Sequence, residues 1–141
     1  MIGVIEILKA NAGVTAIVGA GDNAKIYPSE AAQTQAVPYI VVRLLGNSPQ
    51  DTKQGVSSLD ETTVAVYCCQ SSYLLSRTLA EAVRSALDRS TISGGAETVQ
   101  AIYFQDEDTY KAEIGSGTDK TSGSNKEIYE TEHIYNVWIK R

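Results

Sequence analysis

Alternating apolar side chains mark four long segments of the chain as β-strands. The first begins with Pro38, which a strand tolerates there because the missing N–H is lost only at its end. β-branched and aromatic residues then recur with a period of two, and three later segments repeat this pattern. The predicted strands are residues 38–46, 60–70, 98–109 and 127–140. The third is expected to end in the acidic run 106–108, and Val99 and Ile102 are expected to face opposite ways.

The first of these strands is apolar on both faces. Ile40 and Val42 point to one face, whereas Tyr39 and Val41 point to the other. A strand of this kind is covered on both sides or lies in a contact between subunits.

Helical periodicity marks two further segments. Residues 2–10 place Ile2, Ile5 and Leu8 at helical spacing, with Gly13 as the expected C-terminal cap. Residues 14–18 are interpreted as a short second turn, with a helical conformation as the alternative. The second helix follows the N-cap pair Ser71-Ser72 and runs to about Asp88, with an apolar stripe formed by Leu75, Leu79, Ala82, Val83, Ala86 and Leu87.

Two polar, glycine-containing segments, residues 47–58 and 112–126, are predicted to be mobile loops. Together the elements predict a single α+β domain over residues 1–141, with a mainly antiparallel sheet of about four strands packed against two helices. A right-handed crossover through residues 60–109 would allow one parallel pair.

The composition fits a globular protein of one domain, because 43% of the 141 residues are hydrophobic. No apolar run approaches the roughly 20 residues that a membrane helix needs. The first residues lack a basic lead and include Glu6, which argues against a signal peptide. We therefore expect a soluble, intracellular protein.

The formal net charge is -5, and no block of Lys or Arg is present. Proteins that wrap nucleic acid neutralise phosphates with clustered basic residues, so this chain is a poor candidate for that role. An acidic surface would instead suit a protein past which DNA slides without being held.

Catalytic motifs are absent from the sequence, and we predict no enzyme, cofactor or metal site. His133 is the only histidine, and its place in a strand favours a packed or surface side chain over a general base. Asp106 and Asp108 fall on one face of a strand and could hold Mg²⁺ with a substrate phosphate. A small Mg²⁺-dependent phosphate-cleaving enzyme is therefore an alternative, against the simpler interpretation of a solvated strand end.

Cys68 and Cys69 are neighbours in a strand, so their side chains point to opposite faces and a bond between them would be strained. We expect both to be small buried side chains. Eight tyrosines accompany one Phe and one Trp. Tyrosine suits half-buried interface positions, which favours a contact between subunits.

The order of landmarks resembles the tail-completion, or tail-terminator, family of long-tailed bacteriophages. The resemblance covers nearly the whole chain, although the long segment 112–126 departs from the family pattern. It rests on the first helix ending at Asn11-Ala12-Gly13-Val14, on Ile26-Tyr27-Pro28, on residues 37–42, on Val64-Ala65-Val66-Tyr67, on residues 79–87, on the strand containing residues 106–108 and on the closing tyrosine-rich strand.

This resemblance implies a structural virion protein that forms a ring, commonly of six subunits, at the head-proximal end of the tail tube. Such a ring stops tube polymerisation, contacts the tube protein and the head–tail connector, and lets DNA pass through its bore. The implied location is the virion tail, and the host cytoplasm during assembly. A connector or tube subunit is the related alternative. The candidate lumen or interface residues are Asp106, Glu107, Asp108, Glu130 and Glu132.

Overall fold

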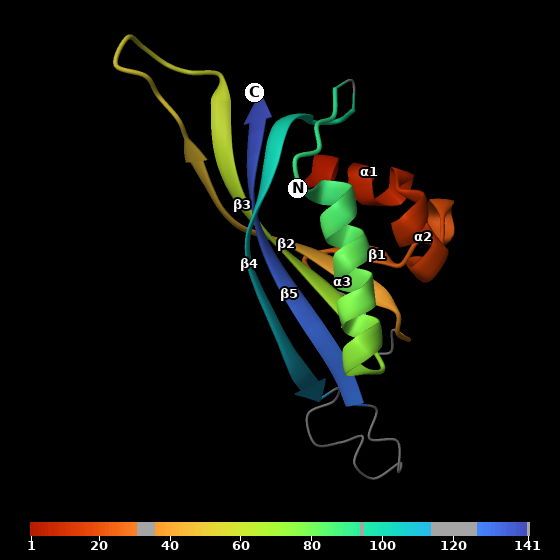
Figure 1. The fold of residues 1–141 in the computed structure, drawn as a ribbon. Coiled ribbons are helices and arrows are strands. Elements are labelled where there is room, and N and C mark those ends of the chain that lie inside the picture. Colours follow the sequence, from red (N-terminus) through yellow and green to blue (C-terminus); the bar gives the residue numbers. More distant parts are fainter. Residues whose placement is uncertain (31–35, 94, 114–126, 141) are drawn as a thin grey trace.

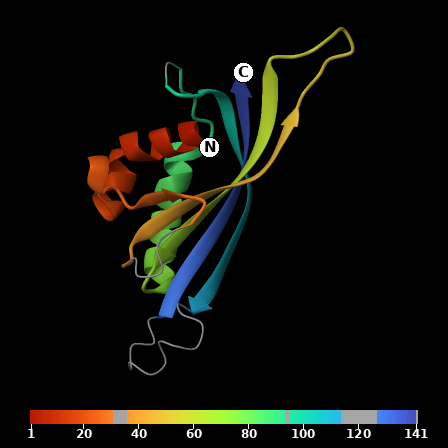
Figure 2. The same ribbon diagram turned by 180° about the vertical axis from the view of Figure 1, so that it is seen from behind.

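The computed structural model describes residues 1–30, 36–93, 95–113 and 127–140. Its helices are α1 (Ile2–Ala10), α2 (Ala12–Val18) and α3 (Tyr73–Leu87), with a 3-10 turn at Gly21–Asn23. The described strands join in one sheet in the order β1-β2-β3-β5-β4, and the helices cover one of its faces (Figures 1 and 2). The strands are β1 (Ile26–Pro28), β2 (Tyr39–Pro49), β3 (Leu59–Gln70), β4 (Thr98–Glu113) and β5 (Glu127–Lys140).

The α+β prediction is confirmed, but the described residues form five strands and three α-helices rather than about four and two. Strand β1 is not among the predicted strands, because its three residues are too few to show a period of two. Residues 14–18, for which the sequence allows either a short turn or a helical conformation, belong to helix α2. The N-cap of α2 is Asn11, whose side chain accepts a hydrogen bond of 3.1 Å from Val14 N–H. Gly13 therefore lies inside α2, and the prediction that it caps α1 is wrong.

The possible crossover through residues 60–109 is present, because α3 connects β3 to β4 and the two strands run parallel, but they do not pair with each other. β5 lies between β3 and β4 and is antiparallel to both, so the strands that flank α3 are not neighbours. The parallel pair is formed by β1 and β2 instead. β5 takes a central position and contributes a row of alternate buried side chains, Thr131, His133, Tyr135 and Val137, to the face beneath the helices.

The hairpin between β2 and β3 projects beyond the helical layer (Figure 1). The two strands stay paired to Pro49 and Asp60, which shortens the predicted loop 47–58 to residues 50–58. In the second predicted loop, Ala112 and Glu113 belong to β4, and residues 114–126 lie outside the described residues.

Two irregularities in β4 change the predicted strand. A register shift between Val99 and Ala101 lets both Val99 and Ile102 enter the core, although simple alternation would place them on opposite faces. A second shift lies between Phe104 and Asp106, and the strand continues past it to Glu113. The acidic run therefore lies within β4, and its prediction as a strand end is wrong.

The core lies between α3 and the sheet, where Leu79, Val83 and Leu87 are fully buried. Ser72 caps α3 as predicted, because its hydroxyl accepts a hydrogen bond from Leu75 N–H. Leu75 itself is 47% exposed. Ser76 takes the sheet-facing position in its place, where its hydroxyl donates to the Cys68 carbonyl at 2.9 Å.

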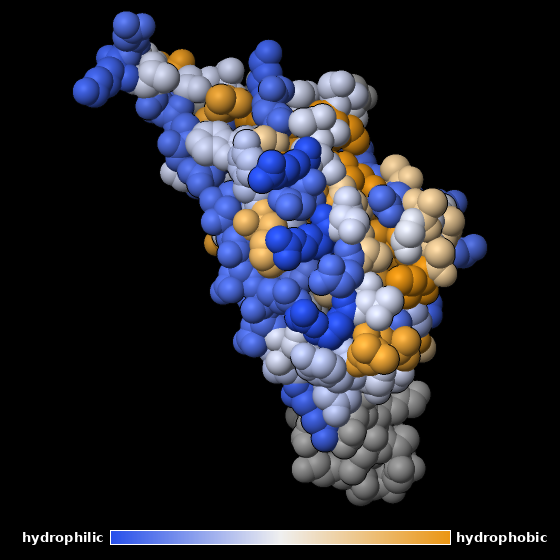
Figure 3. Space-filling view, viewed as in Figure 1, coloured by the Kyte–Doolittle hydropathy of each residue, from blue (hydrophilic) through white to orange (hydrophobic). Residues whose placement is uncertain are grey.

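Apolar side chains also lie on the outer surface of the helical layer. Figure 3 shows them over α2 and over the N-terminal end of α3, where Leu74 is 73% exposed and Tyr73 is 55% exposed. Exposed apolar patches can serve as interaction surfaces. Among the described helices, none has the length and apolar character needed to cross a membrane.

Candidate functional site on the open face of the sheet

The face of the sheet opposite the helices carries carboxylates and tyrosines in cross-strand rows. Figure 2 shows the backbone of this sheet. In one row, Asp108 lies opposite Glu132, which lies opposite Tyr67. The next row contains Tyr110, Glu130, Cys69 and Tyr39. Because Glu130 and Glu132 alternate along β5 with the buried Thr131 and His133, their side chains share the open face.

The structure brings four of the five candidate carboxylates together on this face. Burial, followed by the charges of Glu130, Asp108 and Asp106, raises the pKa of Glu132 above its ordinary value. Like charges that face each other across two strands destabilise a sheet, so the Asp108–Glu132 pair opposes folding of the isolated subunit. Because the fold keeps this unfavourable pair, we infer that the two carboxylates serve a purpose other than stabilising the subunit.

Glu107, the fifth candidate, points to the other face of the sheet. It lies opposite His133 in the register and forms an ion pair with Arg77 of α3. The Glu107 side chain is 19% exposed. The structure therefore separates Glu107 from the other four carboxylates and makes it part of the contact between helix and sheet.

Tyrosines border a hollow of about 360 Å³ on the open face. Tyr39, Tyr67 and Tyr110 line it together with Arg43 and Glu130. A second hollow, of about 340 Å³, lies beside Tyr103 and Trp138 on the same sheet. Seven of the eight tyrosines thus occupy half-buried or exposed positions, as expected, whereas Tyr135 is fully buried.

The two cysteines are free thiols on opposite faces of β3, as predicted. Cys68 is fully buried beneath the helices, whereas Cys69 donates a hydrogen bond to Glu130 at 3.4 Å on the open face. Burial, together with the charge of Glu130, raises the pKa of the Cys69 thiol. Both thiols therefore stay protonated and unreactive at neutral pH.

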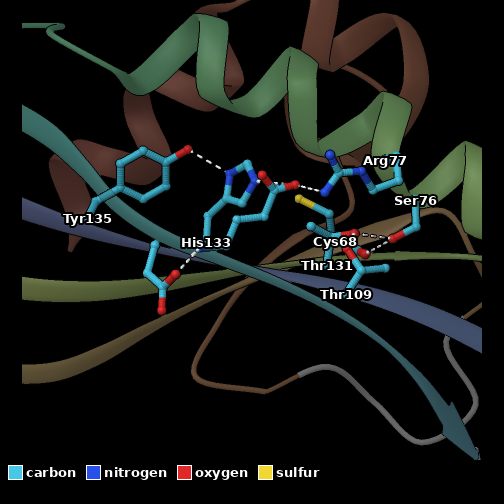
Figure 4. Close-up of polar contacts among 9 residues, drawn as sticks. Cys68, Ser76, Arg77, Thr109, Thr131, His133 and Tyr135 are labelled. Carbon is cyan, nitrogen blue, oxygen red and sulfur yellow. Dashed lines mark hydrogen bonds and ion pairs between the residues drawn. The ribbon is translucent and has the colours of Figure 1, made fainter.

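A buried polar cluster joins α3 to the sheet (Figure 4). His133 is fully buried, as the packed interpretation predicted, and its Nδ1 lies 2.9 Å from the Tyr135 hydroxyl. Its Nε2 lies 3.6 Å from the Glu107 carboxylate that pairs with Arg77. Nearby, the Ser76 hydroxyl lies 2.8 Å from the Thr131 hydroxyl. The sequence indicated that His133 and Tyr135 share one face of a strand, but it indicated neither the sheet-facing position of Ser76 nor the pairing of Arg77 with Glu107.

The buried His133 predicts a pH-dependent stability. Burial lowers its pKa below the ordinary 6.5, despite the opposing effect of Glu107. The unfolded chain therefore binds the proton more readily, so the stability is full above about pH 6.5 and is lost as pH falls through the folded-state pKa. Urea unfolding at pH 7.5 and 5.5 should reveal a loss of up to about 1.4 kcal/mol from this group, which His133→Gln removes. An identical loss in both proteins would contradict this assignment.

No three His, Cys, Asp or Glu side chains within the described ranges are grouped to hold a metal ion. Asp106 and Asp108 share a face, but the Mg²⁺ hypothesis gains no further ligand from this part of the chain.

The chain matches the model of a protein family described as tail completion protein gp17, over residues 3–114. No curated protein matches it. Among solved structures, a chain of the virion of a native gene transfer agent particle is similar, with a TM-score of 0.64 and 16% sequence identity. That match covers 98% of this chain and 92% of the other. At this identity the structural match establishes a shared fold.

Proposed function

Since the chain belongs to the tail completion protein gp17 family and is thus a structural protein of phage-type tails, we propose that it caps the head-proximal end of the tail tube. There it stops tube polymerisation and joins the tube to the head connector. The family assignment over residues 3–114 carries this proposal. The protein acts without catalysis, in the host cytoplasm during assembly and in the virion tail afterwards.

The subunits act as a closed ring, with six as the expected number. Exposed apolar side chains on separate parts of the surface support this, because Val56 on the hairpin is 86% exposed and Leu74 on α3 is 73% exposed. Two different patches favour a head-to-tail contact, which either closes into a ring or grows into a filament. A ring matches the circular cross-section of a tube.

The projecting hairpin, residues 50–58, contacts the tube or connector protein. The parts of β2 and β3 that lead into this loop bury little apolar surface. Leu44 of β2, where this part of the strand begins, is itself 48% exposed. An extended element of this kind gains order and apolar contacts when a partner covers it.

Four carboxylates of the open face, Asp106, Asp108, Glu130 and Glu132, supply negative surface to the bore. Their shared face supports this proposal, because DNA phosphates would be repelled rather than held by counterion release. DNA then passes through without specific binding.

Light scattering of the protein at several concentrations, alone and with the tube protein, tests the ring. We expect a discrete cyclic mass that the tube protein stabilises, without growth into filaments. Counting the copies on intact tails gives an independent measurement. One copy per tail would contradict the ring.

A further inference from the structure

The tyrosine-lined hollow spans the sheet where several strands meet. Tyr39 comes from β2, Tyr67 from β3 and Tyr110 from β4, so residues from distant parts of the chain surround one space of about 360 Å³. Glu130 of β5 and Glu30, which follows β1, add carboxylates to its lining. Aromatic side chains and carboxylates thus border a volume large enough to admit one long side chain.

Negative charge predominates in and around this hollow. Arg43 is the one positive side chain that lines it among the described residues, against Glu30 and Glu130. Glu132 and Asp108 lie in the adjacent row. None of Asp106, Asp108, Glu130 and Glu132 forms an ion pair within the described part of the chain. Within the described residues, the hollow therefore presents aromatic rings beside Glu130, a carboxylate that forms no ion pair there.

We propose that this hollow binds one arginine or lysine side chain of another tail protein. A cation over the face of a tyrosine ring is attracted by the ring quadrupole, and a carboxylate such as Glu130 adds a charge-assisted hydrogen bond. The planar guanidinium of arginine can satisfy both demands, stacking on a ring while its N–H groups donate to a carboxylate. The site shares Glu130 with the proposed bore surface, so both proposals concern the same face of the sheet, but binding of a basic side chain can be tested without the capping role.

Charge favours a different protein over a second copy of this chain as the occupant. A second copy carries the same net charge of -5, so its approach to the acidic face is opposed by long-range repulsion. Two of the chain's own arginines are also engaged on α3: Arg77 pairs with Glu107, and Arg84 stacks over Phe104 at 3.9 Å. A basic segment of another protein meets neither obstacle, whereas a phosphate is repelled.

Titration with a short capped peptide containing two arginines, followed by NMR of the tyrosine rings, tests the site in the intact chain. We expect saturable shifts at Tyr39, Tyr67 and Tyr110, with at least tenfold weaker binding by the same peptide carrying citrulline, the neutral analogue of arginine. Glu130→Gln should weaken binding by about three- to tenfold, and Tyr110→Leu by a similar factor. Glu81→Gln, which removes one exposed charge from α3, is the matched control and should bind like the parent protein.

Equal binding of the arginine and citrulline peptides, an equal effect of Glu81→Gln, or no saturable shift would overturn the proposal. Circular dichroism of each variant separates loss of the site from loss of the fold, and Tyr110→Phe, which keeps the ring, should retain binding. If the tyrosine signals instead move when the protein alone is diluted, the occupant is a second copy and the assignment to another protein is wrong.

Discussion

Replacing Leu79 by alanine is expected to lower the free energy of unfolding by about 3 kcal/mol, within the range of 2–5 seen for buried leucines. Leu79 is fully buried in the cluster between α3 and the sheet. The substitution removes apolar contacts and leaves a cavity that the long, paired strands beneath it cannot close. Urea unfolding monitored by circular dichroism gives the change directly.

Leu74→Ala, on the same helix, is the matched control. Leu74 is 73% exposed, so we expect a change within about 0.5 kcal/mol. Similar losses in the two variants would show that α3 does not pack on the sheet through the face described above.

Charge reversal of Asp106 and Asp108 to lysine is expected to create DNA binding that salt abolishes. The two lysines would stand on the open face beside Glu132, and they would replace repulsion across the β4–β5 pair with attraction. Stability should therefore stay the same or rise by several tenths of a kcal/mol. Two added phosphate contacts predict that log affinity falls with log salt with a slope of about -2.

The double variant Asp22→Lys/Glu81→Lys provides the control, because both residues are exposed, lie away from the open face and change the net charge equally. Fluorescence anisotropy with a DNA duplex at several salt concentrations compares the two proteins. In assembled particles, the open-face variant should also slow DNA ejection. Equal DNA binding by both variants, or unchanged ejection, would count against a lumenal position for Asp106 and Asp108.

The long elements of the fold could be predicted because their patterns span many residues. The alternation from Tyr129 to Ile139 identified the buried face of β5, and the stripe of α3 identified Leu79 and Val83 as core. The short elements could not be predicted reliably, because β1 has three residues and α2 has seven, which is too few to show a period. The bulges of β4 could not be predicted either, because they depend on the pairing of β4 with β5.

The candidate site could be predicted only in part, for a related reason. Alternation placed Asp106 and Asp108 on one face, and thereby Glu107 on the other. The opposition of Asp108 and Glu132 depends on the register between two strands, which the sequence does not encode locally. The ion pair between Glu107 and Arg77 likewise depends on where α3 crosses the sheet.

The length of tails assembled without this protein tests the account most directly. When the gene for this chain is deleted, electron microscopy of the products should reveal tubes of irregular and excessive length that are not joined to heads. Supplying the intact chain should restore tails of uniform length that are joined to heads. Absence of tubes would indicate a tube subunit, and tails of normal length that fail only to join heads would indicate a connector. Tails of normal length joined to heads would contradict the proposed function.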